Sequence, residues 1–358
     1  MNDIFAMNRP ALQDFLFSQG MKKFRADQIL HYIYKEHIYD WDDMLLLPRS
    51  DRTLLKKELP LYVPAEDTQR WENACIRCGA YPLVLPHDGN TVKLLLELID
   101  GQTVETVLMK HDYGNSVCLS SQVGCAVNCA FCASAKNGFI RNLTVGEMVS
   151  QLLAFRKYVT ADLHSIVLMG TGEPLLNYDN VLAFMRLIHE KETLYLGYRN
   201  MTLSTSGIVP AMDRFSSEGL PVNLAVSLHA PNDRIRRRIM PVAGTYALKD
   251  ILAAADRCFK ATGRRVTFEY ILIRDVTCTP DCATQLVRLL AGKNILVNAI
   301  PVNDNYDVGL HRPEKKQIDD FYRYVKDHGV HITLRREMGS GIQAACGQLR
   351  SKRRKERV

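Results

Sequence analysis

The stretch Gly124-Cys125-Ala126-Val127-Asn128-Cys129-Ala130-Phe131-Cys132 holds three cysteines with the spacing C-x3-C-x2-C among small residues. Three thiolates this close together can share one metal centre, but they leave one coordination position without a protein ligand. A structural zinc site would need a fourth protein ligand nearby. A four-iron cluster held by three cysteines instead leaves one iron open to a ligand from outside the protein. The loop therefore predicts a metal centre of one of these two kinds.

The composition is that of a globular protein with a mildly basic surface. The chain has 358 residues, of which 47% are hydrophobic and 24% charged, and its net charge is +7. This length can bury a large core, and the positive charge is compatible with a polyanionic partner. The first ten residues hold no apolar signal core, and no run of about 18 apolar residues occurs. We therefore expect a cytoplasmic protein without a membrane segment, in which the ten cysteines serve as ligands or catalysts rather than disulfides.

Residues 1–62 predict a separate helical unit, bounded by Pro60 and Pro64. Basic residues lie among its aromatic residues, an arrangement compatible with a nucleic-acid-binding face or with a packed aromatic core and solvated lysines; they are Lys22, Lys23, Arg25 and Lys35 among Phe24, Tyr32 and Tyr34. Residues 63–112 read as extended. The segments 92–99 and 102–109 flank Asp100-Gly101, which predicts a β-hairpin. Cys75 and Cys78 form a possible zinc half-site, but no second pair lies at a matching distance.

From residue 113 to 336 strands and helices alternate, which predicts a parallel sheet with helices outside it. The expected strands cover residues 116–121, 164–169, 200–204, 222–228, 265–273, 295–300 and 330–335. The expected helices cover residues 144–158, 179–190, 209–216, 248–262, 280–290 and 314–328. About six βα units suit a partial barrel. The tail, residues 337–358, ends in a basic run that could contact phosphates.

The conspicuous polar and glycine-rich positions follow the carboxyl ends of these strands, where βα barrels gather their functional residues. The cysteine loop follows the first strand along the chain, and the turn Gly170-Thr171-Gly172-Glu173-Pro174 follows the second. Glycines let a ligand approach the backbone, and Glu173 can accept a hydrogen bond from an amino group. The later strands end near Ser204, Ser227-Leu228-His229 and Asn303, which can bind hydroxyl or carboxylate groups. Each alone could be a helix cap or a tight turn, but together they predict one ligand site.

Two further cysteines belong to the same rim. Cys118 lies on the first strand, and Cys346 lies in Ala344-Ala345-Cys346-Gly347-Gln348-Leu349 beyond the last strand. A partial barrel brings its first strand and its closing segment to the same open mouth. Either cysteine alone could be a small buried apolar residue.

Several strings resemble one family, the radical S-adenosylmethionine (SAM) adenine-C2 methyltransferases of 23S ribosomal RNA, many of which also act on transfer RNA. The strings are Val117-Cys118-Leu119-Ser120-Ser121-Gln122-Val123-Gly124-Cys125, Met169-Gly170-Thr171-Gly172-Glu173-Pro174, Ser204-Thr205-Ser206-Gly207, Ser227-Leu228-His229-Ala230-Pro231-Asn232-Asp233 and Ala345-Cys346-Gly347-Gln348-Leu349. The resemblance runs from Phe24 to Leu349. Residues 71–89 depart from the family pattern and read as an insertion, and residues 339–343 lack the acidic residues expected there.

The resemblance implies an α/β fold: a partial (βα)6 radical SAM barrel with a small N-terminal helical domain and a β-hairpin extension. It implies a [4Fe-4S] cluster on Cys125, Cys129 and Cys132, with SAM on the open iron. By the same resemblance the SAM pocket comprises Gly172, Glu173, Ser204, Ser227, Leu228, His229 and Asn303. It also implies that Cys346 carries the methyl group as S-methylcysteine, that Cys118 resolves the RNA adduct through a disulfide, and that Glu105 accepts a proton. From its place in the sequence alone, Glu105 is expected to face solvent.

The implied partners are 23S rRNA, transfer RNA and an external electron donor, for a monomeric enzyme that uses two SAM molecules per turnover. Two other interpretations use the same cysteines. One is the related adenine-C8 methyltransferase that confers antibiotic resistance, although Gly172-Glu173-Pro174 and Val127-Asn128 resemble the C2 group more closely. The other is a zinc-stabilised RNA-binding protein without catalysis, which leaves Cys118, Cys346 and the polar rim unexplained.

Overall fold

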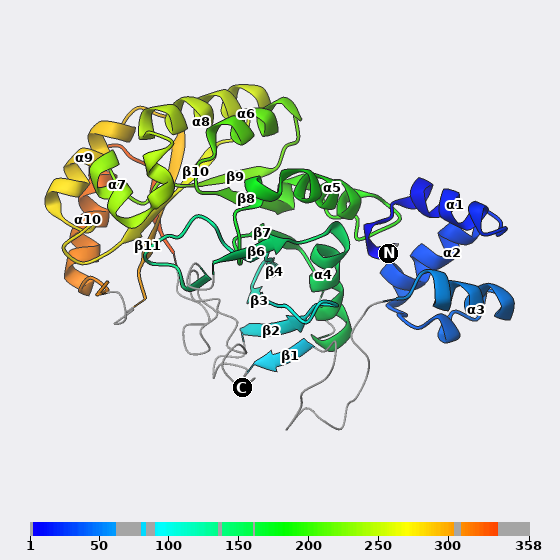
Figure 1. Cartoon of the computed structure of the whole chain (residues 1–358). Coiled ribbons are helices and arrows are strands. Elements are labelled where there is room, and N and C mark those ends of the chain that lie inside the picture. Colours follow the sequence, from blue (N-terminus) through cyan, green and yellow to red (C-terminus); the bar gives the residue numbers. More distant parts are fainter. Residues whose placement is uncertain are drawn as a thin grey trace.

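The computed structural model describes residues 3–61, 80–83, 90–134, 138–159, 162–303 and 309–335. Ten strands form one sheet in the order β1-β2-β3-β4-β7-β8-β9-β10-β11-β12, and helices cover its outer side (Figure 1). Cys346, Cys75, Cys78 and most of the expected insertion 71–89 lie outside the described residues. No helix within the described ranges has both the length and the apolar character that a bilayer span requires.

The expected N-terminal helices are confirmed. They are η1 (Ile4–Ala6), α1 (Arg9–Ser18), α2 (Arg25–His31), η2 (Tyr32–Glu36), η3 (Trp41–Asp43) and α3 (Arg49–Glu58), drawn in blue in Figure 1. The Asn8 side chain accepts a hydrogen bond from the Ala11 amide and so caps α1, with Pro10 in its first turn. The packed aromatic core is confirmed for two of the three aromatic residues, and the nucleic-acid-binding face stays a prediction. Tyr32 and Tyr34 are buried in the core, whereas Phe24 is 50% exposed, with the Arg25 guanidinium 4.9 Å from its ring centroid.

The predicted hairpin is confirmed, and it continues the main sheet. Strands β2 (Thr91–Glu97) and β3 (Thr103–His111) pair antiparallel around Asp100-Gly101. Strand β1 (Ala80–Leu83) pairs with the far edge of β2, and β4 (Gly114–Cys118) pairs antiparallel with β3 and parallel with β7. The hairpin is therefore an extension of the barrel wall.

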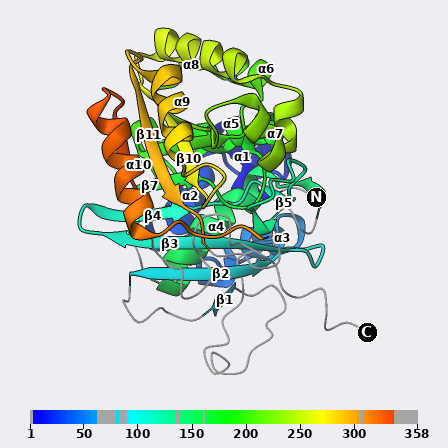
Figure 2. The same cartoon turned by 90° about the vertical axis from the view of Figure 1, so that its left-hand side faces the viewer.

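The alternating part of the chain forms the predicted curved parallel sheet. Its strands after β4 are β7 (Ser165–Leu168), β8 (Met201–Thr205), β9 (Asn223–Ser227), β10 (Val266–Leu272), β11 (Ile295–Pro301) and β12 (Ile332–Leu334). Its long helices are α4 (Val145–Val159), α5 (Tyr178–His189), α6 (Val209–Ser217), α8 (Leu248–Thr262), α9 (Pro280–Leu290) and α10 (Lys315–Asp327). Figure 2 shows β2 and β3 running across the view while β11 stands nearly upright, so the sheet turns strongly between these strands.

Three local features differ from the sequence-based expectation. The first barrel strand ends at Cys118 rather than Ser121, because the next residues leave the ladder: the Ser120 Oγ donates to the Glu105 carbonyl and the Ser121 amide to the Thr171 carbonyl. Residues 122–124 and 139–142 form a separate two-stranded sheet, β5 (Gln122–Gly124) with β6 (Phe139–Asn142). A short helix, α7 (Asp233–Ile239), follows β9.

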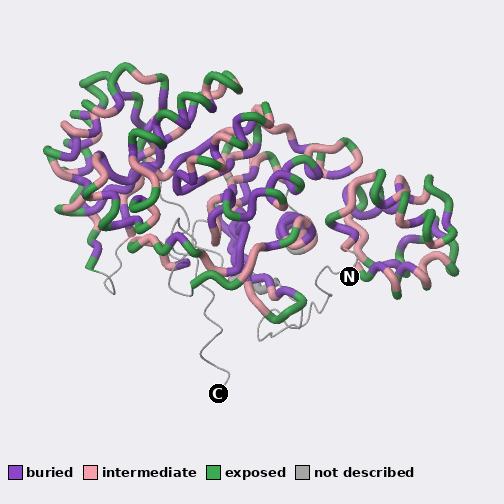
Figure 3. The backbone as a smooth tube through the Cα atoms, turned by 45° about the horizontal axis from the view of Figure 1, so that its top comes forward, coloured by how far each residue is buried: buried purple, intermediate pink, exposed green. Residues whose placement is uncertain are grey.

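The core lies between the sheet and its helices. In Figure 3 the strands and the inward sides of the helices are buried, while exposed segments lie along the outer helix surfaces. The largest apolar side chains sealed here include Phe155, Phe184 and Phe268, on α4, α5 and β10. The opposite face of the strands, which we call the lumen face, carries the polar residues described next.

Candidate active site at the carboxyl ends of the strands

The cysteine loop is the connection between β5 and β6. Its base is closed by a hydrogen bond from the Cys125 amide to the Gly138 carbonyl, 3.1 Å long. Gly124 stands there with φ of +73°, and a Cβ at this position would lie 1.7 Å from the Gly138 oxygen. Only glycine fits this position, since any side chain would push the two ends of the loop apart. The Cys132 amide donates to the Cys129 carbonyl at 3.1 Å, so the last two cysteines share one tight turn.

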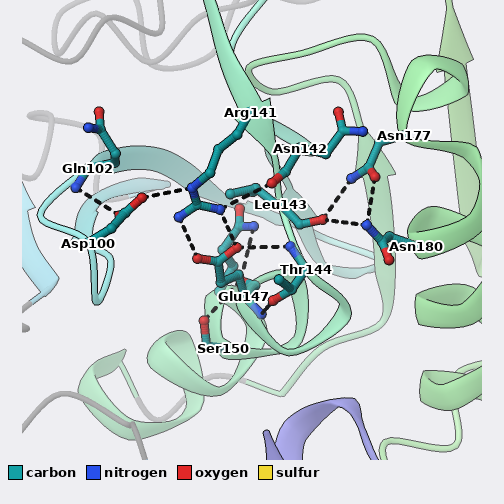
Figure 4. Close-up of polar contacts among 11 residues, drawn as sticks. Asp100, Gln102, Arg141, Asn142, Leu143, Thr144, Glu147, Ser150, Asn177 and Asn180 are labelled. Carbon is teal, nitrogen blue, oxygen red and sulfur yellow. Dashed lines mark hydrogen bonds and ion pairs between the residues drawn. The ribbon is translucent and has the colours of Figure 1, made fainter. Parts of the chain in front are cut away.

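Arg141 on β6 ties the base of the loop to two other elements, as Figure 4 shows. Its Nε donates to the Asp100 carboxylate of the hairpin turn at 2.8 Å, and its two other nitrogens donate to Glu147 of α4 at 2.7 and 2.8 Å. Glu147 also accepts from the Thr144 amide and completes a capping box at the start of α4. Hydrogen bonds to Glu147 and Asp100 raise the pKa of Arg141, and Arg141 lowers the pKa of Asp100.

The carboxyl ends of other strands hold the far side of the loop. The Phe131 ring, between two of the cysteines, meets the His229 ring edge-on, with ring centroids 4.9 Å apart. The Ala130 amide donates to the Ile239 carbonyl at the end of α7, at 3.0 Å. The Ser134 and Thr171 hydroxyls lie 3.3 Å apart. The structure therefore brings together the cysteine loop, the Gly170–Pro174 turn and the end of β9.

The three cysteines are half-buried, and burial disfavours their charged form. Burial, with smaller contributions from Cys132 and Glu173, raises the pKa of Cys125 to about 11, and burial also raises the pKa of Cys129. The described residues contain no group of three or more Cys, His, Asp or Glu side chains placed to hold a single metal ion. The part of the chain described here thus supplies no four-ligand zinc site. Soft thiol donors that become thiolates on a cationic centre suit an iron–sulfur cluster, which separates its ligands farther than one ion does.

The register of the sheet places four predicted site residues on the lumen face. Residues paired across neighbouring strands share a face, and so do residues two apart on one strand. The pairs that connect β3 to β10 in this way are Val107–Cys118, Cys118–Val167, Val167–Thr202, Ser204–Ala225 and Ser227–Glu269. Alternation along the strands therefore puts Glu105, Cys118, Ser204 and Ser227 on the lumen face.

The expectation that Glu105 faces solvent was wrong. Its side chain is 3% exposed, and its carboxylate pairs with the Nζ of Lys93, which is 5% exposed, at 2.8 Å. Alternation along an isolated hairpin leaves one face to water. This hairpin belongs to the barrel wall, and residues on both faces of β2 and of the middle of β3 are buried.

Glu173 is fully buried and joins neighbouring strand ends. One carboxylate oxygen accepts from the Leu175 amide at 3.0 Å and the other from the Ser206 amide at 2.6 Å, while the Glu173 amide donates to Gln122 on β5 at 2.8 Å. Burial raises the pKa of Glu173, and the two amides oppose that shift. Gly172 allows this approach, since its φ is +114° and a Cβ would lie 2.7 Å from the Gln122 side chain. The carboxylate keeps lone pairs that a bound amino group could use.

Two buried polar atoms at the rim, the His229 Nδ1 and the Ser121 Oγ, have no hydrogen-bond partner among the described residues. Burial lowers the pKa of His229 to about 3, so the ring is neutral and can offer an acceptor nitrogen. Unpaired polar atoms in a protein interior are costly, and a ligand such as SAM could satisfy them. Asn303 follows β11 at the same rim and is half-buried.

Arg236 on α7 was not predicted as a site residue, yet it organises the rim. It is fully buried, and its guanidinium donates to the carbonyls of Ser206 at 2.6 Å and of Ser227 and Leu228 at 3.1 Å each. Burial lowers its pKa to about 10. It is one of four arginines in a seven-residue helix, and so many charged residues obscure the helical spacing of the apolar ones. The Asn232 cap is the one sequence signal that could have predicted this helix.

We expect Arg236→Met to destabilise the protein by about 2–4 kcal/mol, because it leaves several buried carbonyls without donors. Guanidinium denaturation of wild type and variant measures this loss. The neighbouring Arg237 is exposed, and Arg237→Met should stay within about 0.5 kcal/mol of wild type. Equal stabilities of the two variants would refute the structural role of Arg236.

Comparisons with known proteins agree with this geometry. Residues 119–278 match the family model of the radical SAM superfamily, and residues 2–60 match that of the ribosomal RNA large subunit methyltransferase N-terminal domain. The chain is 39% identical over 350 residues to the probable dual-specificity RNA methyltransferase RlmN of Clostridium novyi, covering 98% of each chain. It is 42% identical to the protein of the same description from Symbiobacterium thermophilum, covering 98% of this chain and 92% of the relative.

Among solved structures, a radical SAM methyltransferase from Sphaerobacter thermophilus superposes with a TM-score of 0.90 at 40% identity, over 98% of this chain and 99% of that chain. The similarity thus extends through the helical N-terminus, the hairpin and the barrel. The chain belongs to the RlmN family of radical SAM RNA methyltransferases.

Proposed function

We propose that this enzyme methylates C2 of one adenine in the peptidyl-transferase region of 23S rRNA, and adenine 37 of some transfer RNAs. The observation that carries the proposal is the lumen face, where Glu105 and Cys118 lie on the wall of the same barrel whose rim holds the cysteine loop. Adenine C2 is electron-poor and does not act as a nucleophile, so direct methyl transfer from SAM to this carbon is unfavourable.

The rim residues would hold the two cofactors. Cys125, Cys129 and Cys132 would ligate the [4Fe-4S] cluster. SAM would bind next to the cluster in the predicted pocket, whose residues are Gly172, Glu173, Ser204, Ser227, Leu228, His229 and Asn303. The donor chemistry of the half-buried thiols and the unpaired polar atoms of the rim support this assignment. When bound, the cluster and SAM together supply a carbon radical strong enough to remove hydrogen from a methyl group.

Three residues would act on the RNA. The Cys346 thiolate first takes a methyl group from SAM and presents it to the adenine as S-methylcysteine. After the methyl group has lost one hydrogen, its carbon would bond to C2 and tether the RNA to Cys346, and Glu105 would accept the proton that C2 loses. The Cys118 thiolate would then attack the Cys346 sulfur. The disulfide forms as the bond between that sulfur and the methylene carbon breaks, and this carbon takes up a proton to become the methyl group of the released product.

The disulfide must be reduced before the next turnover, and the cluster needs an external electron donor. We infer a monomeric enzyme that works in the cytoplasm, where its RNA substrates and reducing agents are found. The +7 net charge favours contact with RNA phosphates.

The proposal is tested by anaerobic methylation of a 23S rRNA fragment and of transfer RNA, followed by digestion and mass spectrometry. We expect 2-methyladenosine from the rRNA fragment and from a subset of transfer RNAs. Methylation at C8 instead would establish the alternative activity. A colourless preparation with one zinc ion per chain and no methylation of either RNA would refute the enzymatic function.

A further inference from the structure

We propose that Lys93 is a positioning residue, which holds the Glu105 carboxylate ionised and aimed into the barrel lumen beside Cys118. The inference rests on the proposed function, because it takes Glu105 as the proton acceptor. It adds a residue from a different strand, β2, to the machinery that handles the substrate proton.

The pair is fixed by the register of the hairpin. Lys93 is paired with Val107, and Leu95 with Glu105, so the lysine and the glutamate are diagonal neighbours on one face of the ladder. The Lys93 Nζ lies 2.8 Å from the Glu105 Oε1, within hydrogen-bond distance. Both side chains are at most 5% exposed, so neither can swing into bulk water.

Two side-chain hydrogen bonds lock this part of β3 to the end of β4. The Thr106 Oγ1 donates to the Cys118 carbonyl at 2.8 Å, and the Ser120 Oγ donates to the Glu105 carbonyl at 2.7 Å. Glu105 and Cys118 therefore cannot shift independently. The contact with Lys93 restricts the rotation of the carboxylate about its own side chain.

Stability alone does not account for a buried ion pair here. Removing two charges from water costs several kcal/mol per ion, and well-packed apolar residues of similar size are often as stabilising. The opposite face of the same hairpin is mainly aliphatic, with Leu94, Leu96 and Leu108 buried. Buried ionisable groups that face the lumen of an enzyme barrel, despite their desolvation cost, are typical of functional sites.

The proposed reaction needs an ionised Glu105 carboxylate, and the positive charge of Lys93 favours that form. A carbon that exchanges its hydrogen for a methyl group releases one proton, and only an ionised Glu105 can take it. A buried carboxylate without a counter-charge favours its protonated form. The Lys93 ammonium group is a cation in direct contact with this carboxylate. Glu97 of β2, His111 of β3 and the Cys118 thiol of β4 lie on the same lumen face.

The test compares methylation rates of Lys93→Met and wild type over a range of pH. Without the ammonium group, Glu105 should hold its proton at neutral pH, so the rate should fall by about tenfold or more and recover at alkaline pH. Lys110 lies on β3 and is exposed, and Lys110→Met should keep the wild-type rate and profile. A wild-type profile for Lys93→Met, or a loss that is equal at every pH, would refute the proposal.

Two more variants separate this inference from the proposed function. If Glu105→Gln methylates normally, Glu105 is not the proton acceptor, and the proposed role fails whatever Lys93 does. If Glu105→Gln is impaired, adding Lys93→Met to it should cause little further loss of rate, since Lys93 acts through Glu105. If Lys93→Met does not fold, Lys93→Arg provides the test. This variant keeps the positive charge, so we expect a reduced methylation rate with an unshifted pH profile. A shifted pH profile would contradict the proposal.

Discussion

Replacing Cys346 with Ala should abolish methylation of both RNAs, by at least about 1,000-fold, because no other group can take over the methyl carrier. The variant should still bind its cluster, since the loop that carries Cys125, Cys129 and Cys132 is held by the hydrogen bond from the Cys125 amide to Gly138 and by the Phe131–His229 ring contact. Radioactive methyl transfer from SAM to RNA measures the loss, and visible absorbance of the anaerobic protein reports the cluster.

The matched control is Cys258→Ala. Cys258 is a buried thiol of α8 that contacts Ser216, away from the cysteine loop. This variant should methylate RNA at near the wild-type rate once folded. Methylated RNA from Cys346→Ala at more than a trace would remove Cys346 from the reaction, whereas loss of the cluster absorbance would show that the tail also supports the cysteine loop.

Replacing Cys118 with Ala should trap the RNA on the protein. Without the resolving thiol, the bond between Cys346 and the methylated adenine has no partner for disulfide formation, so each chain should stop after one methyl transfer. We expect a covalent protein–RNA species of about one RNA per chain on a denaturing gel. Nuclease treatment should return it to nearly the mobility of the free protein.

The double variant Cys118→Ala with Cys346→Ala provides the control for the trap. It lacks the site of attachment, so no covalent species should form. An adduct in the double variant would mean that RNA is attached elsewhere, and its absence from both variants would exclude Cys118 from the resolving step. The fold should tolerate the change, because the Cys118 side chain is only half-buried and its ladder contacts use the backbone.

The sequence predicted the barrel well because its helices carry strong local signals. Helices α8 and α9 begin and end at the predicted residues, and α9 is marked by Thr279 as its cap, with Pro280 behind it. The order of strands and the collection of polar residues at their carboxyl ends follow from alternation alone. The cysteine spacing and the rim strings identified the family before any geometry was known.

What the sequence missed depends on contacts between distant segments. Whether Glu105 faces water or the lumen is decided by the joining of the hairpin to β4, which no local pattern encodes. Arg236 became a candidate only from the structure, in which α7 brings its guanidinium to the Ser206 and Ser227 carbonyls after β8 and at the end of β9. Strands β5 and β6 are only three and four residues long, which is too short for the alternation of apolar and polar residues to distinguish them from a loop.

The closed base of the cysteine loop has a consequence for how the holoenzyme is made and repaired. Zinc fingers fold around their metal and unfold when it leaves. Here the cysteine loop is held in place by the β5–β6 backbone pairing, by the hydrogen bonds of Arg141 and by packing of Phe131, and none of these contacts involves iron. The apoprotein should therefore persist as a folded acceptor, able to receive a preassembled cluster and, after oxidative damage, a replacement, without being degraded and synthesised again.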